Sequence, residues 1–137
     1  MKENVVYHLV KGEDLNHHGT LFAGRQAEWF VEAGFIAAAL LTKPENIVCA
    51  QIHGMRFTRP VAKGEVVKYI GRIALVGRSK IVAHVAVTGK EDDDFIVDGF
   101  LTFVHVDGLG MPVAHGVPPI EATTEAERLL QNRAAAL

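Results

Sequence analysis

One long apolar segment limits what this chain of 137 residues can fold into. From about Gly24 to Leu41 the sequence is rich in alanine and contains few helix breakers. A segment of this length predicts an α-helix rather than a strand. Apolar residues cover most of the circumference of that helix, which indicates that it is buried inside the fold and does not lie on the surface.

Most of the remaining sequence predicts strands. A short apolar run, Val5 to Val10, precedes the helix, and a polar loop at 11–19 separates the two. The segments after the helix that are rich in valine, isoleucine and phenylalanine are 47–57, 66–77, 80–88 and 95–106. The breaks between them are short, so we expect hairpins and antiparallel pairing. One antiparallel sheet wrapped around one long helix, an α+β architecture, accommodates all of these segments.

The last predicted strand is apolar on both faces. One face carries Phe95, Val97, Leu101 and Phe103, and the other carries Ile96, Phe100, Val104 and Val106. A single helix covers only one face of a sheet, so the second face needs another cover. We therefore expect a homo-oligomer in which a second copy buries that face.

The chain length predicts a single domain over residues 1–137, large enough to bury a core without covalent staples. The core is expected to span about residues 5–107. The tail from Pro118 carries charged residues around Leu129 and Leu130, which predicts a short amphipathic helix within about 118–137. Its alanine-rich end is expected to fray.

Composition excludes several classes of function. Fourteen lysines and arginines face sixteen aspartates and glutamates, a balance that lacks the basic surface of nucleic-acid-binding proteins. No apolar run reaches the length of a signal peptide or a membrane span, so we expect a cytoplasmic protein without a membrane partner. Cys49 is the one cysteine, which rules out a multi-cysteine zinc site. Because it stands in an apolar run, we expect it to be buried.

Three segments together resemble the hotdog-fold acyl-CoA thioesterases. The segment 14–24, DLNHHGTLFAG, is similar to the family's loop N-x-x-G-x-[LIV]-[FH]-G-G, with Ala23 replacing one glycine. The segment 55–65, MRFTRPVAKGE, is similar to F-x-x-P-[VA]-x-x-G-[DE], and 76–80, VGRSK, is similar to V-G-[RNT]-[ST]-S. The ordered set covers about residues 5–107 of the chain.

This resemblance implies a hotdog dimer, often built into a tetramer or hexamer, with acyl-CoA at the dimer interface. Water would hydrolyse the thioester to coenzyme A and a carboxylic acid, with no cofactor beyond the CoA of the substrate itself. The family's loop asparagine or aspartate falls on Asn16. The helix start at Gly24 would offer free N–H groups to the negative charge that develops on the carbonyl oxygen. Thr20 would lend a hydroxyl or cap the helix.

The resemblance also implies a carboxylate on the partner's helix, to orient or deprotonate water. Its usual position, seven residues after the last glycine of the loop, holds Val31 here. Two glutamates flank Val31: Glu28 lies about 60° from it around the helix and Glu32 about 100°. Both remain candidates for the missing acid. Both can equally be ordinary polar residues, with Glu28 paired to Arg25.

Histidines supply the remaining titratable candidates. His17 and His18 stand beside Asn16, where either can carry a proton or donate to the thioester, and both can equally be solvated. A metal site lacks a third ligand at suitable spacing. His53, His84 and His105 fall on predicted strands and are expected to be structural.

A basic turn, Arg78, Ser79 and Lys80, carries the groups that suit the phosphates of CoA. An exposed hairpin corner would look the same. Arg59 is a weaker candidate for that role.

Two further functions stay open. The absence of an acid at Val31 fits a hotdog protein that binds acyl-CoA without cleaving it. The spacing from His18 to Glu32 resembles that of the hydroxyacyl thioester dehydratases, although the Phe-Pro pair that follows their histidine is missing. The identity of the acyl group and the choice between dimer, tetramer and hexamer are not readable from the sequence.

Overall fold

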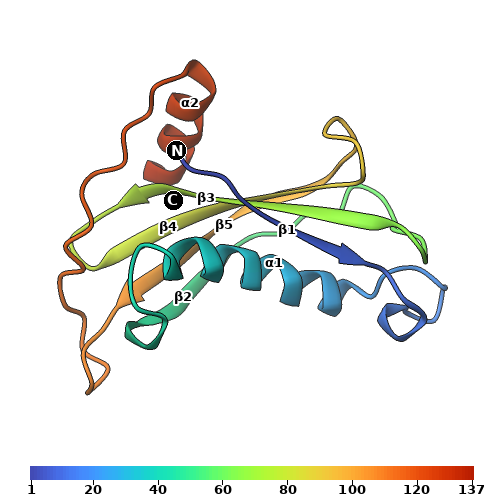
Figure 1. Cartoon of the computed structure of the whole chain (residues 1–137), viewed down its shortest axis with the longest axis horizontal. Coiled ribbons are helices and arrows are strands. Elements are labelled where there is room, and N and C mark those ends of the chain that lie inside the picture. Colours follow the sequence, from blue (N-terminus) through green and yellow to red (C-terminus); the bar gives the residue numbers. More distant parts are fainter.

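The computed structural model describes residues 1–137, and its five-stranded antiparallel sheet wraps around a long helix (Figure 1). The sheet has the order β1-β3-β4-β5-β2. The strands are β1 (Asn4–Leu9), β2 (Ile47–His53), β3 (Val66–Val76), β4 (Lys80–Thr88) and β5 (Phe95–His105). The helices are α1 (Ala23–Ala39) and α2 (Glu125–Ala135), with 3-10 turns η1 (Gly12–Asp14) and η2 (Pro44–Asn46). The predicted α+β class, antiparallel sheet and long central helix are confirmed.

Two glycines allow α1 to lie close against the sheet. A Cβ added to Gly71 on β3 would lie 2.9 Å from the carbonyl oxygen of Ala33 on α1. A Cβ on Gly34 would lie 2.6 Å from the Cδ1 of Leu101 on β5. Because helix backbone meets strand backbone here, the helix sits deep in the sheet, and Phe30 is completely buried between them. This packing fixes where the N-terminus of α1 emerges.

Replacing Gly71 by alanine is expected to lower the free energy of unfolding by about 1–3 kcal/mol, as overpacking of a rigid contact does. The neighbouring atom is a backbone oxygen, which cannot move aside as a side chain can. Gly77→Ala is the control, since a Cβ there would make an ordinary 3.5 Å contact with Lys80. Urea unfolding of both variants measures the difference, and equal midpoints would contradict this account of the packing.

The strand after α1 is shorter than predicted. β2 ends at His53, and residues 54–65 run as an irregular segment instead of continuing to 57. Gly54 has a φ of 71°, a left-handed conformation that breaks an extended strand. The chain then turns towards the N-terminus of α1, where it forms one wall of the candidate site.

The expectation for the two faces of β5 was partly wrong. The pairing with β4 shifts at Thr88, which faces Phe95 while Val87 faces Val97, so Ile96 is an inserted residue. Ile96 therefore turns into the core beside α1, and Phe95 is 46 % exposed. A bulge of this kind leaves no periodic signal in an apolar run.

The chain's own α2 covers part of the second sheet face, which we had expected only another copy to cover. Thr124 caps this helix by accepting a hydrogen bond from the backbone N–H of Glu127. Ala134 packs into a small apolar cluster with Phe100 and Val82 on that face. The predicted C-terminal helix is thus present, and it docks on the sheet (Figure 1).

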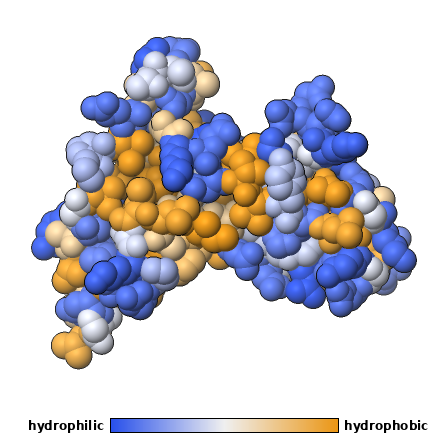
Figure 2. All heavy atoms as spheres, viewed as in Figure 1, coloured by the Kyte–Doolittle hydropathy of each residue, from blue (hydrophilic) through white to orange (hydrophobic).

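Apolar surface nevertheless remains at both sheet edges. On β2, Val48 and Ile52 are 49 % and 46 % exposed, and Cys49 is exposed as well. The expectation of a buried Cys49 was wrong because β2 is an edge strand with β5 as its one neighbour. Apolar surface also crosses the middle of the face shown in Figure 2, with hydrophilic side chains towards its ends. Neither helix combines the length and the hydropathy of a membrane span.

Candidate active site

The loop before α1 is organised by the side chain of Asn16. Its Oδ1 accepts hydrogen bonds from the backbone N–H groups of His18, at 2.9 Å, and Thr20, at 3.1 Å. Its Nδ2 donates to the hydroxyl of Thr20 at 3.1 Å. Gly19 completes the turn with a φ of 77°. Asn16 therefore holds its own loop in shape and retains one N–H for another partner.

The start of α1 offers backbone donors. Phe22 is the N-cap residue, and its side chain forms no capping hydrogen bond. The interpretation of Thr20 as a helix cap was therefore wrong, because its hydroxyl bonds to Asn16 instead. Gly24 lies beneath the ring of Phe22, where a Cβ would come within 2.5 Å of that ring. The first N–H groups of α1 have no side-chain cap and favour negative charge.

Asp14 ties the loop to the helix, a role that the sequence did not reveal. Its side chain is almost completely buried and accepts a 2.9 Å hydrogen bond from the backbone N–H of Lys11. Its other oxygen lies 3.3 Å from Nε of Arg25 on α1. The backbone carbonyl of Asp14 accepts from Phe22 at 2.8 Å. A lone aspartate in a polar loop gives no sequence signal for such burial.

A cavity of about 360 Å³ opens beside this loop. Asn16 and Thr20 line one side of it, and the irregular segment 57–61 forms the other. Gln26, from the first turns of α1, lines it as well and is only 3 % exposed. Gln26 was not singled out from the sequence, where it stands as one polar residue in an apolar helix. Leu21 and Val61 supply buried apolar wall.

Arg59 lies in the same cavity with its guanidinium already engaged. It binds both carboxylate oxygens of Asp94, at 2.9 and 2.6 Å. It also donates to Glu65 at 3.0 Å. Burial alone would raise the pKa of Glu65, but the hydrogen bonds from Arg59 and the backbone N–H of Ala62, together with the charge of Arg59, outweigh it and the pKa is lowered. The three side chains tie segment 57–61 to the hairpin between β4 and β5.

The two candidate acids point in different directions from α1. Glu28 is largely exposed, and its carboxylate lies 3.3 Å from Nη1 of Arg25. Glu32 lies on the β1 side, with Oε1 3.9 Å from Nε2 of His8. Val31, where the resemblance placed the family's acid, packs against the core. Neither glutamate lines the cavity of Asn16 within one chain.

The histidines of this region are divided between loop and core. His17 and His18 stand exposed on the loop with their ring centres 4.0 Å apart, and neither lines the cavity. His8 stacks flat on Trp29 at 4.2 Å, and burial lowers its pKa. No group of three histidine, cysteine or carboxylate side chains lies close enough together to hold a metal.

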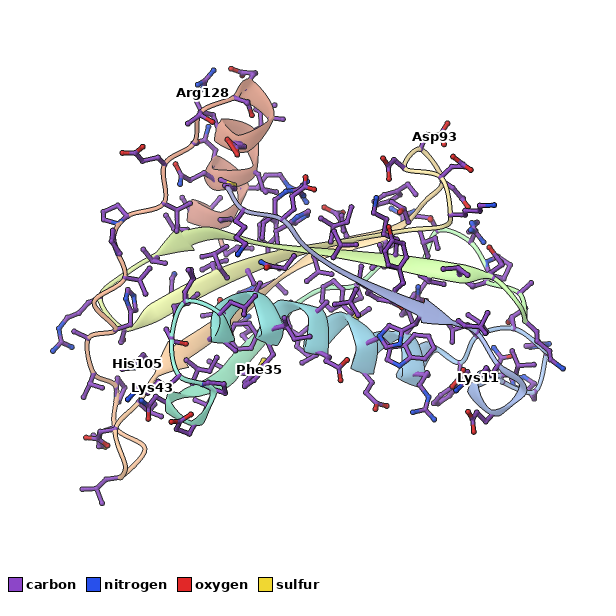
Figure 3. All side chains as sticks on the ribbon, in the orientation of Figure 1. Lys11, Phe35, Lys43, Asp93, His105 and Arg128 are labelled. Atoms are coloured by element: carbon purple, nitrogen blue, oxygen red, sulfur yellow. The ribbon has the colours of Figure 1, made fainter.

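The basic turn lies at the opposite end of the molecule from Asn16. The carbonyl of Ser79 accepts a 2.7 Å hydrogen bond from the backbone N–H of His105. Figure 3 shows His105 at one end of the molecule and Lys11, beside the loop of Asn16, at the other end. The 17 residues of α1 span about 25 Å between these ends. One chain therefore does not bring Arg78 and Lys80 to Asn16.

A family model described as the thioesterase superfamily matches residues 18–96, more than half of the chain. This chain belongs to the thioesterase superfamily. The matched residues of this superfamily member include the loop after Asn16, the whole of α1 and the basic turn. The hotdog architecture expected from the resemblance is confirmed.

Relatives of this superfamily member agree with that assignment. The YkhA protein of Bacillus subtilis, named an uncharacterized acyl-CoA thioester hydrolase, is 30 % identical over 127 residues, 88 % of this chain and 71 % of that protein. An acyl-CoA hydrolase from Bacillus cereus superposes with a TM-score of 0.86 at 26 % identity, covering 98 % of this chain and 82 % of that one. The hexameric thioesterase y2039 from Yersinia pestis gives 0.73 at 28 % identity, covering 82 % and 93 %.

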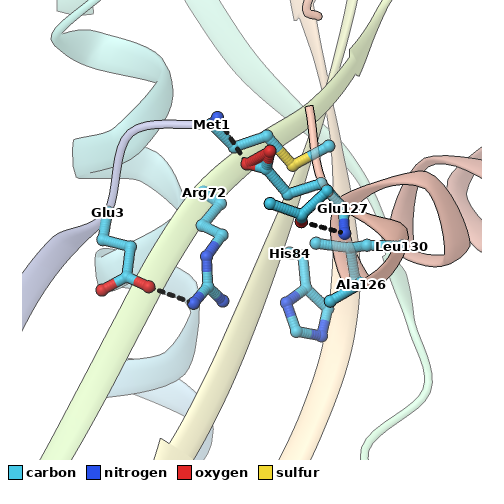
Figure 4. A pocket seen from close by; sticks show the side chains of 8 residues that line it. Met1, Glu3, Arg72, His84, Ala126, Glu127 and Leu130 are labelled. Atoms are coloured by element: carbon cyan, nitrogen blue, oxygen red, sulfur yellow. Dashed lines mark hydrogen bonds and ion pairs between the residues drawn. The ribbon is translucent and has the colours of Figure 1, made fainter. Parts of the chain in front are cut away.

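A second hollow in this thioesterase-superfamily chain lies under α2, on the far face of the sheet (Figure 4). His84 from β4 lines it and donates to Asp98 on β5, which also accepts from Arg133 on α2; both contacts are 2.8 Å. The charged residues at its rim are paired, Arg72 with Glu3 and the terminal amine with Glu127. We interpret the hydrogen bonds among His84, Asp98 and Arg133 as contacts that hold α2 on the sheet.

The hydrogen-bonded pair of His84 and Asp98 predicts that the stability of the fold depends on pH. Burial lowers the pKa of His84 against the opposing effect of Asp98. The unfolded chain therefore takes up a proton near pH 6.5 before the folded protein does, and stability falls as the pH decreases through that value. For Asp98, burial alone would raise the pKa, but hydrogen bonds from His84 and Arg133 outweigh it and lower the pKa, so its contribution is lost only in strong acid, below about pH 4.

The expected result is a Tm that falls between pH 7 and pH 5.5 in the wild type and falls less in His84→Gln. Calorimetry at matched ionic strength measures both slopes. The slope that remains in the variant belongs in part to His8, whose pKa is also lowered. Identical slopes in the two proteins would show that His84 is not the titrating group.

Proposed function

We propose that this chain is an acyl-CoA thioester hydrolase that cleaves acyl-CoA with water to give free CoA and a carboxylic acid. The observation that carries the proposal is Asn16, held beside an uncapped helix start and facing a cavity, in a member of the thioesterase superfamily. The Bacillus subtilis relative is named for this activity. No cofactor is needed, because CoA enters as part of the substrate.

The carbonyl oxygen of the thioester would lie between Asn16 and the start of α1. The free N–H of the Asn16 amide and the backbone N–H groups near Gly24 donate to it as negative charge develops. Thr20 fixes the amide orientation through the 3.1 Å hydrogen bond. Because these donors are in place before substrate arrives, they require no rearrangement during the reaction.

The geometry favours Glu28 over Glu32 as the acid that activates water. Both carboxylates are exposed, but Glu28 lies closer in direction to Val31 and stands nearer the helix start. Glu32 is placed against His8 on the side of β1. The carboxylate of Glu28 would take a proton as the water oxygen attacks the carbonyl carbon, and the proton would pass to the sulfur when the C–S bond breaks.

Two copies of the chain are needed to assemble this site. Neither Glu28 nor the turn of Arg78, Ser79 and Lys80 lines the cavity of Asn16 in its own chain. The open edge of β2 carries exposed apolar residues and free backbone groups, so pairing with a second β2 would extend the sheet. A neighbour's basic turn would then meet the CoA phosphates, whereas Arg59 stays in its ion pairs.

The proposal extends to the oligomeric state of this chain and to its location in the cytoplasm. The thioesterase of Yersinia pestis is hexameric, and we propose that this chain also forms a hexamer, made of three dimers with one hotdog domain per copy. The single exposed thiol of Cys49 is compatible with a reducing cytoplasm.

The test is thiol release from a panel of acyl-CoAs, from acetyl to palmitoyl, by the wild-type protein. Hydrolysis of at least one ester at a rate proportional to enzyme is the expected result. Saturable binding of CoA esters without release of thiol would overturn the proposal.

That outcome would favour the second candidate, an acyl-CoA-binding hotdog protein, which Val31 in the place of the family's acid supports. Under that alternative Val31→Asp would create hydrolysis in an inactive protein. The dehydratase alternative needs a histidine in the site, and His18 stands exposed on the loop, outside the cavity of Asn16. Hydration of crotonyl-CoA without thiol release would support the dehydratase function instead.

A further inference from the structure

Gln26 is an unusual residue for the buried side of α1. The other buried residues of this helix are Trp29, Phe30, Gly34 and three alanines. Gln26 is 3 % exposed, and its Nε2 is buried with no hydrogen-bond partner. Burying an unpaired amide destabilises a protein, whereas leucine would fill the same space without that penalty. The residue is therefore better explained by a bound partner than by packing.

The partner would lie in the cavity that Gln26 shares with Asn16. Nε2 has no hydrogen bond to lose, and rotation about the last side-chain torsion of glutamine is soft, so the amide can turn its N–H groups into the cavity. Two buried apolar residues, Leu21 and Val61, line the same space. An apolar patch on the cavity wall beside one additional donor suits an apolar group that carries one oxygen.

The proposed function already supplies donors for the thioester oxygen, namely Asn16 and the start of α1. The amide of Gln26 is additional to them. Resting on that function, we propose that Gln26 is a specificity-determining residue that donates a hydrogen bond to an oxygen substituent on the acyl chain. The substrate class is then a short hydroxyacyl-CoA or oxoacyl-CoA in preference to a plain alkanoyl-CoA.

A matched pair of substrates tests this, butyryl-CoA and 3-hydroxybutyryl-CoA, with kcat/KM for thiol release measured on wild type and Gln26→Leu. Wild type is expected to prefer the hydroxy ester at least about tenfold, because a buried donor is left unpaired by the other ester. Gln26→Leu is expected to abolish that preference by losing far more activity on the hydroxy ester than on the plain ester. Its Tm should stay equal or rise, since an unpaired buried amide is removed.

Equal loss on both esters, or a wild type without preference, would overturn the specificity role. A fall in Tm together with equal loss would show that Gln26 acts only in packing. Should the wild type release no thiol from any ester, the proposed hydrolase function fails by itself. Calorimetric binding of the two esters to wild type and Gln26→Leu then decides the inference: tighter binding of the hydroxy ester by wild type alone supports it, and equal affinities overturn it.

Discussion

Asn16→Asp is expected to lower kcat/KM for acyl-CoA hydrolysis by at least about a hundredfold, the usual effect of removing one donor from an oxyanion site. The substitution keeps Oδ1, which accepts from His18 and Thr20 and holds the loop. It replaces the Nδ2 donor with a carboxylate oxygen, which repels the negative charge on the carbonyl oxygen. Thiol release under subsaturating substrate measures the loss.

The loop itself supplies the control for this variant. The hydroxyl of Thr20 can donate to the new oxygen, so Asn16→Asp should retain its Tm and its elution volume on size exclusion. Asn16→Ala removes the acceptor as well and is expected to lower the Tm, because two backbone N–H groups lose their partner. Turnover by a correctly assembled Asn16→Asp within about threefold of wild type would remove Asn16 from the mechanism.

Glu28→Gln is expected to lower kcat by about a hundredfold or more, with little change in KM. Glutamine preserves the size of the side chain but cannot accept the proton of the attacking water. The ion pair with Arg25 is lost, yet both groups are on the surface and such pairs contribute little to stability. Single-turnover thiol release separates the chemical step from binding.

Glu32→Gln is the matched control, the same change one helical turn further along α1. Its contact with His8 lies on the side of β1, so its kcat is expected to stay within about twofold of wild type. The reverse pattern, with Glu32→Gln inactive and Glu28→Gln active, would show that Glu32 is the acid. Full activity in both would leave hydrolysis without a glutamate from α1.

The sequence predicted the layers of this fold well because its signals are periodic. An alanine-rich segment of helical length and four β-branched runs separated by turns leave few alternatives, and α1 and β3 to β5 begin and end close to the predicted residues. The end of β2 was missed because Gly54 breaks the strand through its backbone conformation. The bulge at Ile96 was missed because it alters pairing without altering composition.

The site was predicted less completely because its parts meet only in three dimensions. The loop of Asn16 could be found by its resemblance to a motif. Asp14 and Gln26 could not, since burial gives them their roles and neither stands in an informative pattern. Arg59 was recognised as basic, but its partners, Asp94 and Glu65, come from distant or irregular segments. The covering of the second sheet face by α2 depends on tertiary docking that a local helix signal does not specify.

Subunit mixing tests most directly whether one copy's Asn16 works with the other copy's Glu28. Asn16→Asp and Glu28→Gln, each inactive alone, are exchanged at equal concentrations under mild denaturation and refolded together. Half of the dimers then contain both variants, and each of these holds one intact site, so activity should recover to about a quarter of wild type. Mixtures that stay as inactive as the separate variants would contradict a site shared between two copies.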